Sequence, residues 1–233
     1  MKLGIMQPYF FPYIGYWQLM NAVDQYVIFD DVNYINRGYI NRNAILINGI
    51  SHNINLILLE ASQNKHINQI SIDRTPKMQK KLLRTLEMAY AKAPYYQDVM
   101  PMLQGIILQK EENLAKFLLF QIQKIAAYLK MDTKFLLSSE LKKNCSLKGQ
   151  EKILNICKTL NASEYYNAIG GQGLYDPDQF LQQGVKLFFL KTNPQITYAQ
   201  FGKEFVPNLS IIDVIMFNSR EEIADMLEEY TLL

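Results

Sequence analysis

The first 43 residues constrain the fold of this chain more than any other stretch. They begin with a short apolar run, KLGIM, continue through a loop and a helix-length amphipathic stretch, and reach a second apolar run, YVIF. Two strand-length runs joined by a helix-length connection form a βαβ unit, in which the two strands are parallel. We therefore expect an α/β fold with a parallel or mixed sheet opened by this unit. Its helix should run from near Gly15 to about Val23, and its second strand over Gln25–Phe29.

The same unit predicts where a ligand binds. Gln7 follows the first strand, and the acidic pair Asp30 and Asp31 follows the second. Ligands of open α/β sheets bind outside the carboxyl ends of the strands, so these three residues should meet over one crevice. We expect Asp30 or Asp31 to act as the catalytic base. Because adjacent side chains of an extended chain point to opposite faces, only one of the two aspartates should face the ligand.

A polar segment, RGYINRN, comes shortly after the acidic pair. Arginine binds phosphate with two parallel hydrogen bonds, and asparagine both donates and accepts, so the segment is suited to a phosphorylated or sugar ligand. The plainer interpretation is a solvated loop. With Tyr9 from the opening segment, the predicted substrate-binding residues here are Arg37, Asn41, Arg42 and Asn43.

The rest of the chain indicates one α/β domain over residues 1–233, with a helical subdomain or cap at about 76–130. Asn48-Gly49 between alternating apolar residues predicts a β-hairpin. A short strand is expected over Ile67–Ile72, and another ends at Ser138 and Ser139. Helices are expected over 76–92, 114–129, 147–160 and 177–183, a broken one at about 95–108, and two more near the C-terminus.

Two later features are further candidates. Tyr175 lies in a stretch rich in glycine and tyrosine, the residue types that allow close backbone approach and stacking in sugar or nucleotide sites, although a Gly-rich turn is the simpler interpretation. Asp213 lies among apolar residues in a helix that Asn208 is expected to cap. A carboxylate is rarely buried without a partner, so Asp213 should have a partner or belong to a site.

Composition excludes several classes of function. The net charge is only +2, from 24 basic and 22 acidic residues, which does not favour nucleic-acid binding. Two cysteines, Cys145 and Cys157, fit neither a disulfide framework nor a zinc site, and two histidines do not favour histidine-based triads or metal centres. No stretch resembles a signal peptide or reaches the ~20 apolar residues of a membrane span, so we expect a cytoplasmic protein.

Taken together, three segments resemble the WbqC-like protein family: MQPYFFPYIGYWQLMNAVDQYVIFDDVNYINRGYINRN, AYAKAPYY and ITYAQFGKEFVPNLSIIDVIMFN. The resemblance covers nearly the whole chain and implies a role in bacterial surface-polysaccharide assembly, especially O-antigen synthesis. It brings no assigned reaction. The recurring polar positions of the family fall here on Gln7, Asp30, Asp31, Arg37, Asn41, Arg42, Asn43, Gln200, Ser210 and Asp213.

Three functions follow as hypotheses. The first is an enzyme that modifies a nucleotide-activated amino sugar by acyl or aminoacyl transfer. In it Asp30 or Asp31 would act as the base, Arg37 and Arg42 would bind the diphosphate, and Gln7, Asn41 and Asn43 would bind the sugar hydroxyls. Alternatively, the two aspartates bind Mg²⁺ at the diphosphate. The second is a non-catalytic module that binds a sugar nucleotide or a partner enzyme. The third is a nucleotidyltransferase-like or ligase enzyme that uses ATP or CTP. The opening βαβ unit also looks like the start of nucleotidyltransferases that carry a HIGH-type histidine motif. The matching stretch here is YIGY, which has no histidine.

Overall fold

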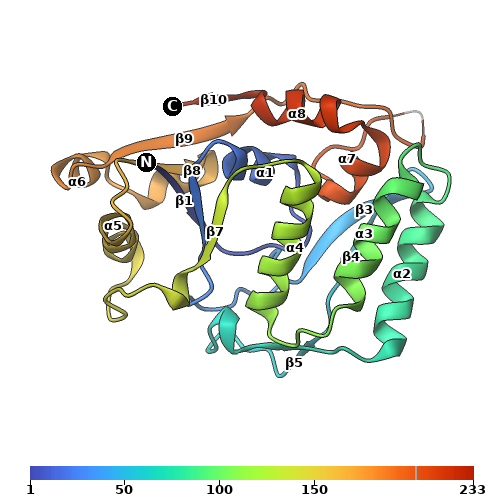
Figure 1. Ribbon diagram of the computed structural model, residues 1–233, viewed down its shortest axis with the longest axis horizontal. Coiled ribbons are helices and arrows are strands. Elements are labelled where there is room, and N and C mark those ends of the chain that lie inside the picture. Colours follow the sequence, from blue (N-terminus) through green and yellow to red (C-terminus); the bar gives the residue numbers. More distant parts are fainter. Residues whose placement is uncertain (203) are drawn as a thin grey trace.

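A computed structural model of the chain describes residues 1–202 and 204–233. Its centre is a six-stranded sheet with the strand order β10-β9-β8-β1-β2-β7 (Figure 1). β10 is antiparallel to β9, and the other neighbouring strands are parallel. The prediction of an α/β fold with a mixed sheet opened by a βαβ unit is confirmed. The strands of this sheet are β1 (Lys2–Met6), β2 (Gln25–Ile28), β7 (Lys134–Leu137), β8 (Glu164–Ala168), β9 (Lys186–Thr192) and β10 (Tyr230–Leu232).

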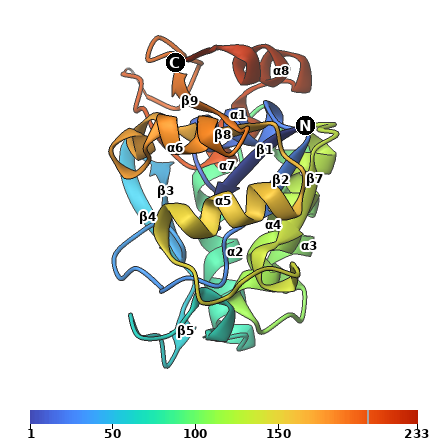
Figure 2. The ribbon, with the colours of Figure 1, turned by 90° about the vertical axis from the view of Figure 1, so that its left-hand side faces the viewer.

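Helices cover both faces of the sheet, which explains why its parallel strands are apolar on both sides. One face packs in a large core with α1 (Ile14–Asn21), α4 (Leu114–Tyr128), α7 (Ile211–Phe217) and α8 (Arg220–Glu228). The other face, which carries Ile5 and Val27, packs in a smaller core with α5 (Gly149–Thr159) and α6 (Pro177–Gln182). Figure 2 shows α5 crossing in front of β1 and β2.

The crossover from β2 to β7 carries a long insertion. It contains β3 (Arg42–Ile47), β4 (Ile50–Asn55), β5 (Leu58–Leu59), β6 (Ser71–Ile72), α2 (Pro76–Tyr90), α3 (Tyr96–Leu108) and α4. The predicted hairpin is confirmed, since Asn48 and Gly49 turn between β3 and β4 with φ values of 53° and 75°. Figure 1 shows α2, α3 and α4 side by side, and their buried residues belong to the same core as those of α1 and α7.

The structure differs from the predicted elements at several places. The strand predicted over Ile67–Ile72 is a 3₁₀ turn, Ile67–Gln69, followed by the two-residue β6. The turn forms because the Gln69 side chain accepts a hydrogen bond of 2.9 Å from the His66 backbone N–H. The helix predicted as broken is continuous, with Pro101 inside α3. The cap of α7 is Ser210, whose Oγ accepts from the Ile212 N–H at 3.2 Å, and not Asn208.

None of the helices among the described residues has the length and apolar character needed to cross a bilayer.

Candidate functional site

The strand order reverses between β1 and β8. From β1 the chain adds β2 and then β7 on one side, and later adds β8 and β9 on the other. In open α/β sheets ligands bind at the carboxyl ends of the strands at such a reversal. A cavity of about 630 Å³ lies there, lined by Met6 of β1, Ala168 of β8 and Thr192 of β9. This volume is in the usual range of small-molecule sites.

Five tyrosines line this cavity: Tyr9, Tyr13, Tyr16, Tyr39 and Tyr198. The centroid of the Tyr9 ring lies 5.1 Å from that of Tyr16 and 5.8 Å from that of Tyr39. Burial raises the pKa of the Tyr9 and Tyr13 phenols above the ordinary value. These hydroxyls therefore stay protonated at neutral pH, where they can donate hydrogen bonds to a ligand.

The first turn of α1 opens onto the same cavity, with Ile14 and Gly15 in its lining. This turn contains no acidic residue, and Tyr13 before it gives no side-chain cap. The indole N–H of Trp17 donates to the Pro12 carbonyl at 3.0 Å and fixes the entry of the chain into the helix. Backbone N–H groups at a helix N-terminus favour negatively charged groups. The cavity therefore has aromatic side chains in its lining and a helix N-terminus that can bind a negatively charged group of a ligand.

Asn43 and Ser210 support the loop that carries the first tyrosines. The Asn43 Nδ2 donates to the carbonyl oxygens of Phe10 at 3.0 Å and Phe11 at 2.7 Å, and Asn43 also contributes to the cavity lining. The Ser210 hydroxyl donates to the Phe11 carbonyl at 2.8 Å. Both predicted residues are buried, and both hold the backbone between Tyr9 and Tyr13. The polar lining is completed by Lys191, Thr192, Asn193 and Asn208.

Asp30 lies at the end of β2, as predicted, with its side chain fully buried. Its Oδ1 accepts from the Ser139 backbone N–H at 2.9 Å, and its Oδ2 accepts from the Ser139 hydroxyl at 2.6 Å. The carboxylate thereby fastens the turn after β7 to the end of β2. Asp30 does not line the cavity.

Asp31 pairs with two lysines that sequence reasoning missed. Its Oδ2 lies 2.8 Å from Lys143 Nζ and 3.0 Å from Lys152 Nζ, and the aspartate side chain is 12% exposed. Burial alone raises the pKa of this carboxyl, but hydrogen bonds, led by that from Lys143, hold it below its ordinary value. Lys152 belongs to α5, on the face of the sheet opposite α1. Asp31 is likewise absent from the cavity lining.

The polar segment after Asp31 is held by its own backbone. The Arg42 guanidinium donates to the carbonyl oxygens of Gly38 and Arg37, and Arg37 is exposed with a φ of 60°. Asn41 Oδ1 accepts from the Tyr34 hydroxyl at 2.8 Å, and its Nδ2 donates to the Leu56 carbonyl at 3.0 Å. Of this segment, Tyr39 and Asn43 line the cavity, whereas Arg37, Asn41 and Arg42 do not.

Asp213 lies in α7, fully buried, and accepts hydrogen bonds of 2.8 Å from three side chains. Tyr90 donates to its Oδ1, and Tyr198 and Gln200 donate to its Oδ2. Burial raises the pKa of this carboxyl above its ordinary value, despite the hydrogen bonds that lower it. Gln200 and Asp213, two of the predicted substrate-binding residues, are thus brought together beside Tyr198, a residue of the cavity wall.

The two remaining predicted residues, Gln7 and Tyr175, do not line the cavity. The Gln7 carbonyl accepts a hydrogen bond from the Tyr16 hydroxyl. The Tyr175 hydroxyl lies 3.3 Å from that of Tyr165 and accepts from Asn167 Nδ2 at 3.1 Å, in a cluster beneath the end of β8. Of the predicted residues, Tyr9 and Asn43 line the cavity.

Sequence reasoning missed most of the cavity lining. Tyr13, Tyr16 and Gly15 fall within PYFFPYIGY, and the density of aromatic residues between two strands was the available signal. Thr192 and Tyr198 have no local signal, because only the pairing of β9 with β8 brings them beside the N-terminal loop.

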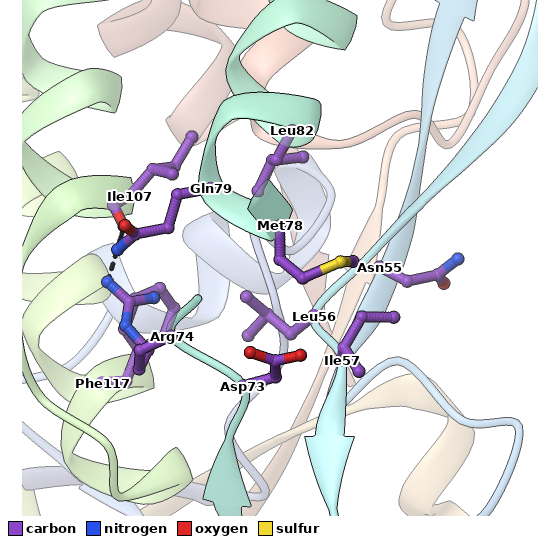
Figure 3. Close-up of a pocket in the computed structure, with 10 residues that line it drawn as sticks. All are labelled: Asn55, Leu56, Ile57, Asp73, Arg74, Met78, Gln79, Leu82, Ile107 and Phe117. Atoms are coloured by element: carbon purple, nitrogen blue, oxygen red, sulfur yellow. Dashed lines mark hydrogen bonds between the residues drawn. The ribbon is translucent and has the colours of Figure 1, made fainter. Parts of the chain in front are cut away.

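A second cavity, of about 20 Å³, is lined by residues of β4, α2, α3 and α4 and of the connections between them (Figure 3). One wall is Arg74, whose guanidinium donates to the carbonyl oxygens of Ile107, at 2.6 Å, and of Gln109, and lies 5.1 Å from the centroid of the Phe117 ring. These carbonyl groups lie at the C-terminal end of α3, so Arg74 caps that helix. A space of this size holds about one water molecule. The pocket in Figure 3 therefore has a structural role.

No group of three or more His, Cys, Asp or Glu side chains arranged to hold a metal ion is found among residues 1–202 and 204–233.

Comparisons with known proteins place the chain in a family. It matches the WbqC-like protein family over residues 7–225. It is 26% identical over 228 residues to "Uncharacterized protein Rv1507c" of Mycobacterium tuberculosis (strain ATCC 25618 / H37Rv), with 97% of each chain covered. No solved structure matches. Because the family match spans more than half of the chain, this protein belongs to the WbqC-like protein family.

Proposed function

We propose that this protein binds a nucleotide-activated amino sugar in the cavity at the ends of β1, β8 and β9, and modifies its amino group by acyl or aminoacyl transfer during bacterial surface-polysaccharide synthesis. The observation that carries the proposal is the cavity itself, a space of about 630 Å³ at the reversal of strand order, walled by five tyrosines. Tyrosine rings stack on sugars and bases, while their hydroxyls bond to polar ligand atoms.

The polar residues around the cavity suit such a ligand. Thr192, Asn193 and Asn208 can donate to and accept from sugar hydroxyls. The start of α1 and the exposed Lys191 favour the diphosphate that links nucleotide and sugar.

In the proposed reaction the amine nitrogen attacks the acyl carbonyl carbon and a C–N bond forms. The leaving group departs with the electron pair of its bond to that carbon and takes up the proton that the amine loses. Among the described lining residues, Lys191 and the tyrosines are the ionisable ones. The raised pKa of Tyr9 and Tyr13 suits them to donate hydrogen bonds to the developing oxyanion rather than to accept that proton. A catalytic role of Asp30 or Asp31 stays a prediction, tested below.

A second candidate function is nucleotidyl transfer or ligation with ATP or CTP. It is favoured by the N-terminus of α1, whose first turn lines the cavity and contains no acidic residue. A nucleoside triphosphate would place its phosphates there and release pyrophosphate.

Thermal unfolding with a panel of ligands tests the proposal. The panel contains UDP- and dTDP-linked amino sugars, each beside its N-acetylated counterpart, together with ATP, CTP and acetyl-CoA, with and without Mg²⁺. A ligand at ~100 times its Kd adds about 2.7 kcal/mol to the free energy of unfolding. For a chain of this size that raises Tm by roughly 5–10 °C.

The proposal predicts a shift with an amino sugar nucleotide and a smaller one with the N-acetylated counterpart, in which the reacting group is blocked. A shift with ATP or CTP alone would favour the second candidate. A bound amino sugar that no acyl donor converts would indicate a binding module.

A further inference from the structure

One wall of the cavity is formed by the connection between β9 and α7, called here the connecting segment, of which residues 193–202 and 204–210 are described. Its residues Ile196, Tyr198, Phe205 and Leu209 all line the cavity. The described residues of the segment form neither helix nor strand, so side-chain contacts contribute strongly to its position.

The segment is folded on itself by two contacts. Gln200 Nε2 donates to the Val206 carbonyl at 3.1 Å, and Gln200 Oε1 accepts from the Val206 N–H at 2.8 Å. The rings of Tyr198 and Phe205 meet edge to face, with centroids 5.2 Å apart. These contacts join residues 198–200 to residues 205–206 in a loop, and Tyr198 and Phe205 both line the cavity.

The Asp213 carboxylate ties this loop to the core by hydrogen bonds, beside the edge-to-face contact of the Phe201 and Phe217 rings, whose centroids lie 4.8 Å apart. Asp213 Oδ2 accepts from the Tyr198 hydroxyl and from Gln200 Nε2, each at 2.8 Å. Its Oδ1 accepts from the Tyr90 hydroxyl at 2.8 Å, and that hydroxyl accepts in turn from the Leu46 N–H at 3.4 Å. One oxygen of Asp213 thus holds the cavity wall, while the other is anchored to α2 and β3.

We infer that Asp213 is a positioning residue, which holds Tyr198 and Gln200 and so sets the place of the cavity wall formed by the connecting segment. The inference rests on the proposed function insofar as this cavity binds the ligand. Asp213 itself is fully buried, and it acts on the ligand through Tyr198. A carboxylate can accept all three of these hydrogen bonds at once, whereas an amide in its place has one accepting oxygen and an NH₂ group that only donates.

Hydrogen exchange of the full chain tests the inference without any ligand. The reporter is the peptide that contains the Val206 N–H, which is bonded to Gln200. We compare wild type with Asp213→Asn and with the milder Tyr198→Phe, which keeps the ring and removes the hydrogen bonds that the hydroxyl donates to Asp213 and accepts from Gln200. Tyr90→Phe is the matched control, since it removes a hydrogen bond to the same carboxylate on the side away from the wall.

Asp213→Asn and Tyr198→Phe should speed exchange at the reporter at least tenfold, with β1 and β2 unchanged, whereas Tyr90→Phe should change it less than threefold. Unchanged exchange at the reporter in Tyr198→Phe overturns the inference. So does a rise in Tyr90→Phe as large as that in Tyr198→Phe, or an equal rise over the whole chain, because either would mean that the hydrogen bonds stabilise the fold in general.

A binding measurement follows with UDP-glucosamine as the probe. The inference predicts at least tenfold weaker binding to Tyr198→Phe than to Tyr90→Phe. If exchange rises but binding is equal, the wall does not shape the site and the inference fails. If wild type binds no nucleotide sugar, the proposed function fails, and the exchange result alone decides whether Asp213 positions the wall.

Discussion

Gly15 and Thr192 approach so closely that a Cβ built on the glycine would lie 2.4 Å from the Thr192 hydroxyl oxygen and 2.6 Å from the Tyr13 ring. A real Cβ is essentially never found at such distances. The absent side chain lets the start of α1 meet the end of β9 beside the cavity.

Substituting this glycine with alanine should therefore disturb the site. We expect Gly15→Ala to be destabilising and to weaken ligand binding, since Tyr13 and Thr192, both in the lining, must move. The control is Gly105→Ala in α3, where an added Cβ meets nothing within 4 Å. There alanine should stabilise the helix by about 0.5–1 kcal/mol. Urea unfolding of both variants measures the difference, and equal effects would contradict the role of the close approach.

The Asp31 carboxylate stabilises the fold through Lys143 and Lys152. Asp31→Asn leaves two largely buried ammonium groups without their anion, so it should lower the free energy of unfolding by about 3–5 kcal/mol. Glu60→Gln is the control, because the Glu60–Lys65 pair is exposed and such pairs contribute little. Denaturant unfolding at pH 7 measures both. A loss in Asp31→Asn no larger than that in Glu60→Gln would show that the lysine pairs are weak.

The pH dependence follows from the sign of the Asp31 shift. The pKa of Asp31 in the folded state lies below the unfolded value of 3.8, so its contribution is present above that value and is lost as pH falls through the folded pKa. The difference in unfolding free energy between wild type and Asp31→Asn should be constant from pH 8 to about 5 and shrink below about pH 4. A difference that stays constant down to pH 2.5 would contradict the assigned shift.

Substitution of Asp30 tests whether this residue has a catalytic or a structural role. Both of its oxygens accept hydrogen bonds from Ser139, so Asp30→Asn should lower stability while nucleotide-sugar affinity at 20 °C stays within twofold. Ser139→Ala, which removes the hydroxyl donor, should give a smaller loss of stability and the same affinity. If Asp30→Asn instead abolished turnover with stability intact, the prediction that Asp30 is the catalytic base would hold.

The fold was predictable because its signals are local. The βαβ unit follows from apolar runs of strand and helix length, and the Asn48-Gly49 turn fixes the hairpin. Position at the ends of strands also predicted where Gln7 and Asp30 lie. The pairing of Asp31 with Lys143 and Lys152 was not predictable, since more than 100 residues separate the carboxylate from either lysine.

The cavity lining was predictable only in part, because some of its residues come from distant parts of the chain. The N-terminal segment predicts Tyr9 and Asn43, and the reversal of strand order lies beside that segment. Tyr198 lies far along the chain, follows β9, and is held at the cavity wall by contacts that include its hydrogen bond to Asp213. Asp213 was expected to have a partner, and its partners Tyr90, Tyr198 and Gln200 explain its burial without direct contact between Asp213 and the cavity.

We propose that a nucleotide-activated amino sugar occupies the tyrosine-lined cavity. Calorimetric titration of wild type and Tyr39→Ala with UDP-glucosamine tests it most directly, because Tyr39 is 57% exposed and its loss should spare the core. Tyr128→Ala, in α4 and outside the cavity lining, is the control. Loss of a stacking ring should weaken binding by about 1–3 kcal/mol in Tyr39→Ala and leave the control unchanged. Equal affinities in all three proteins, or no binding to wild type, would contradict the account.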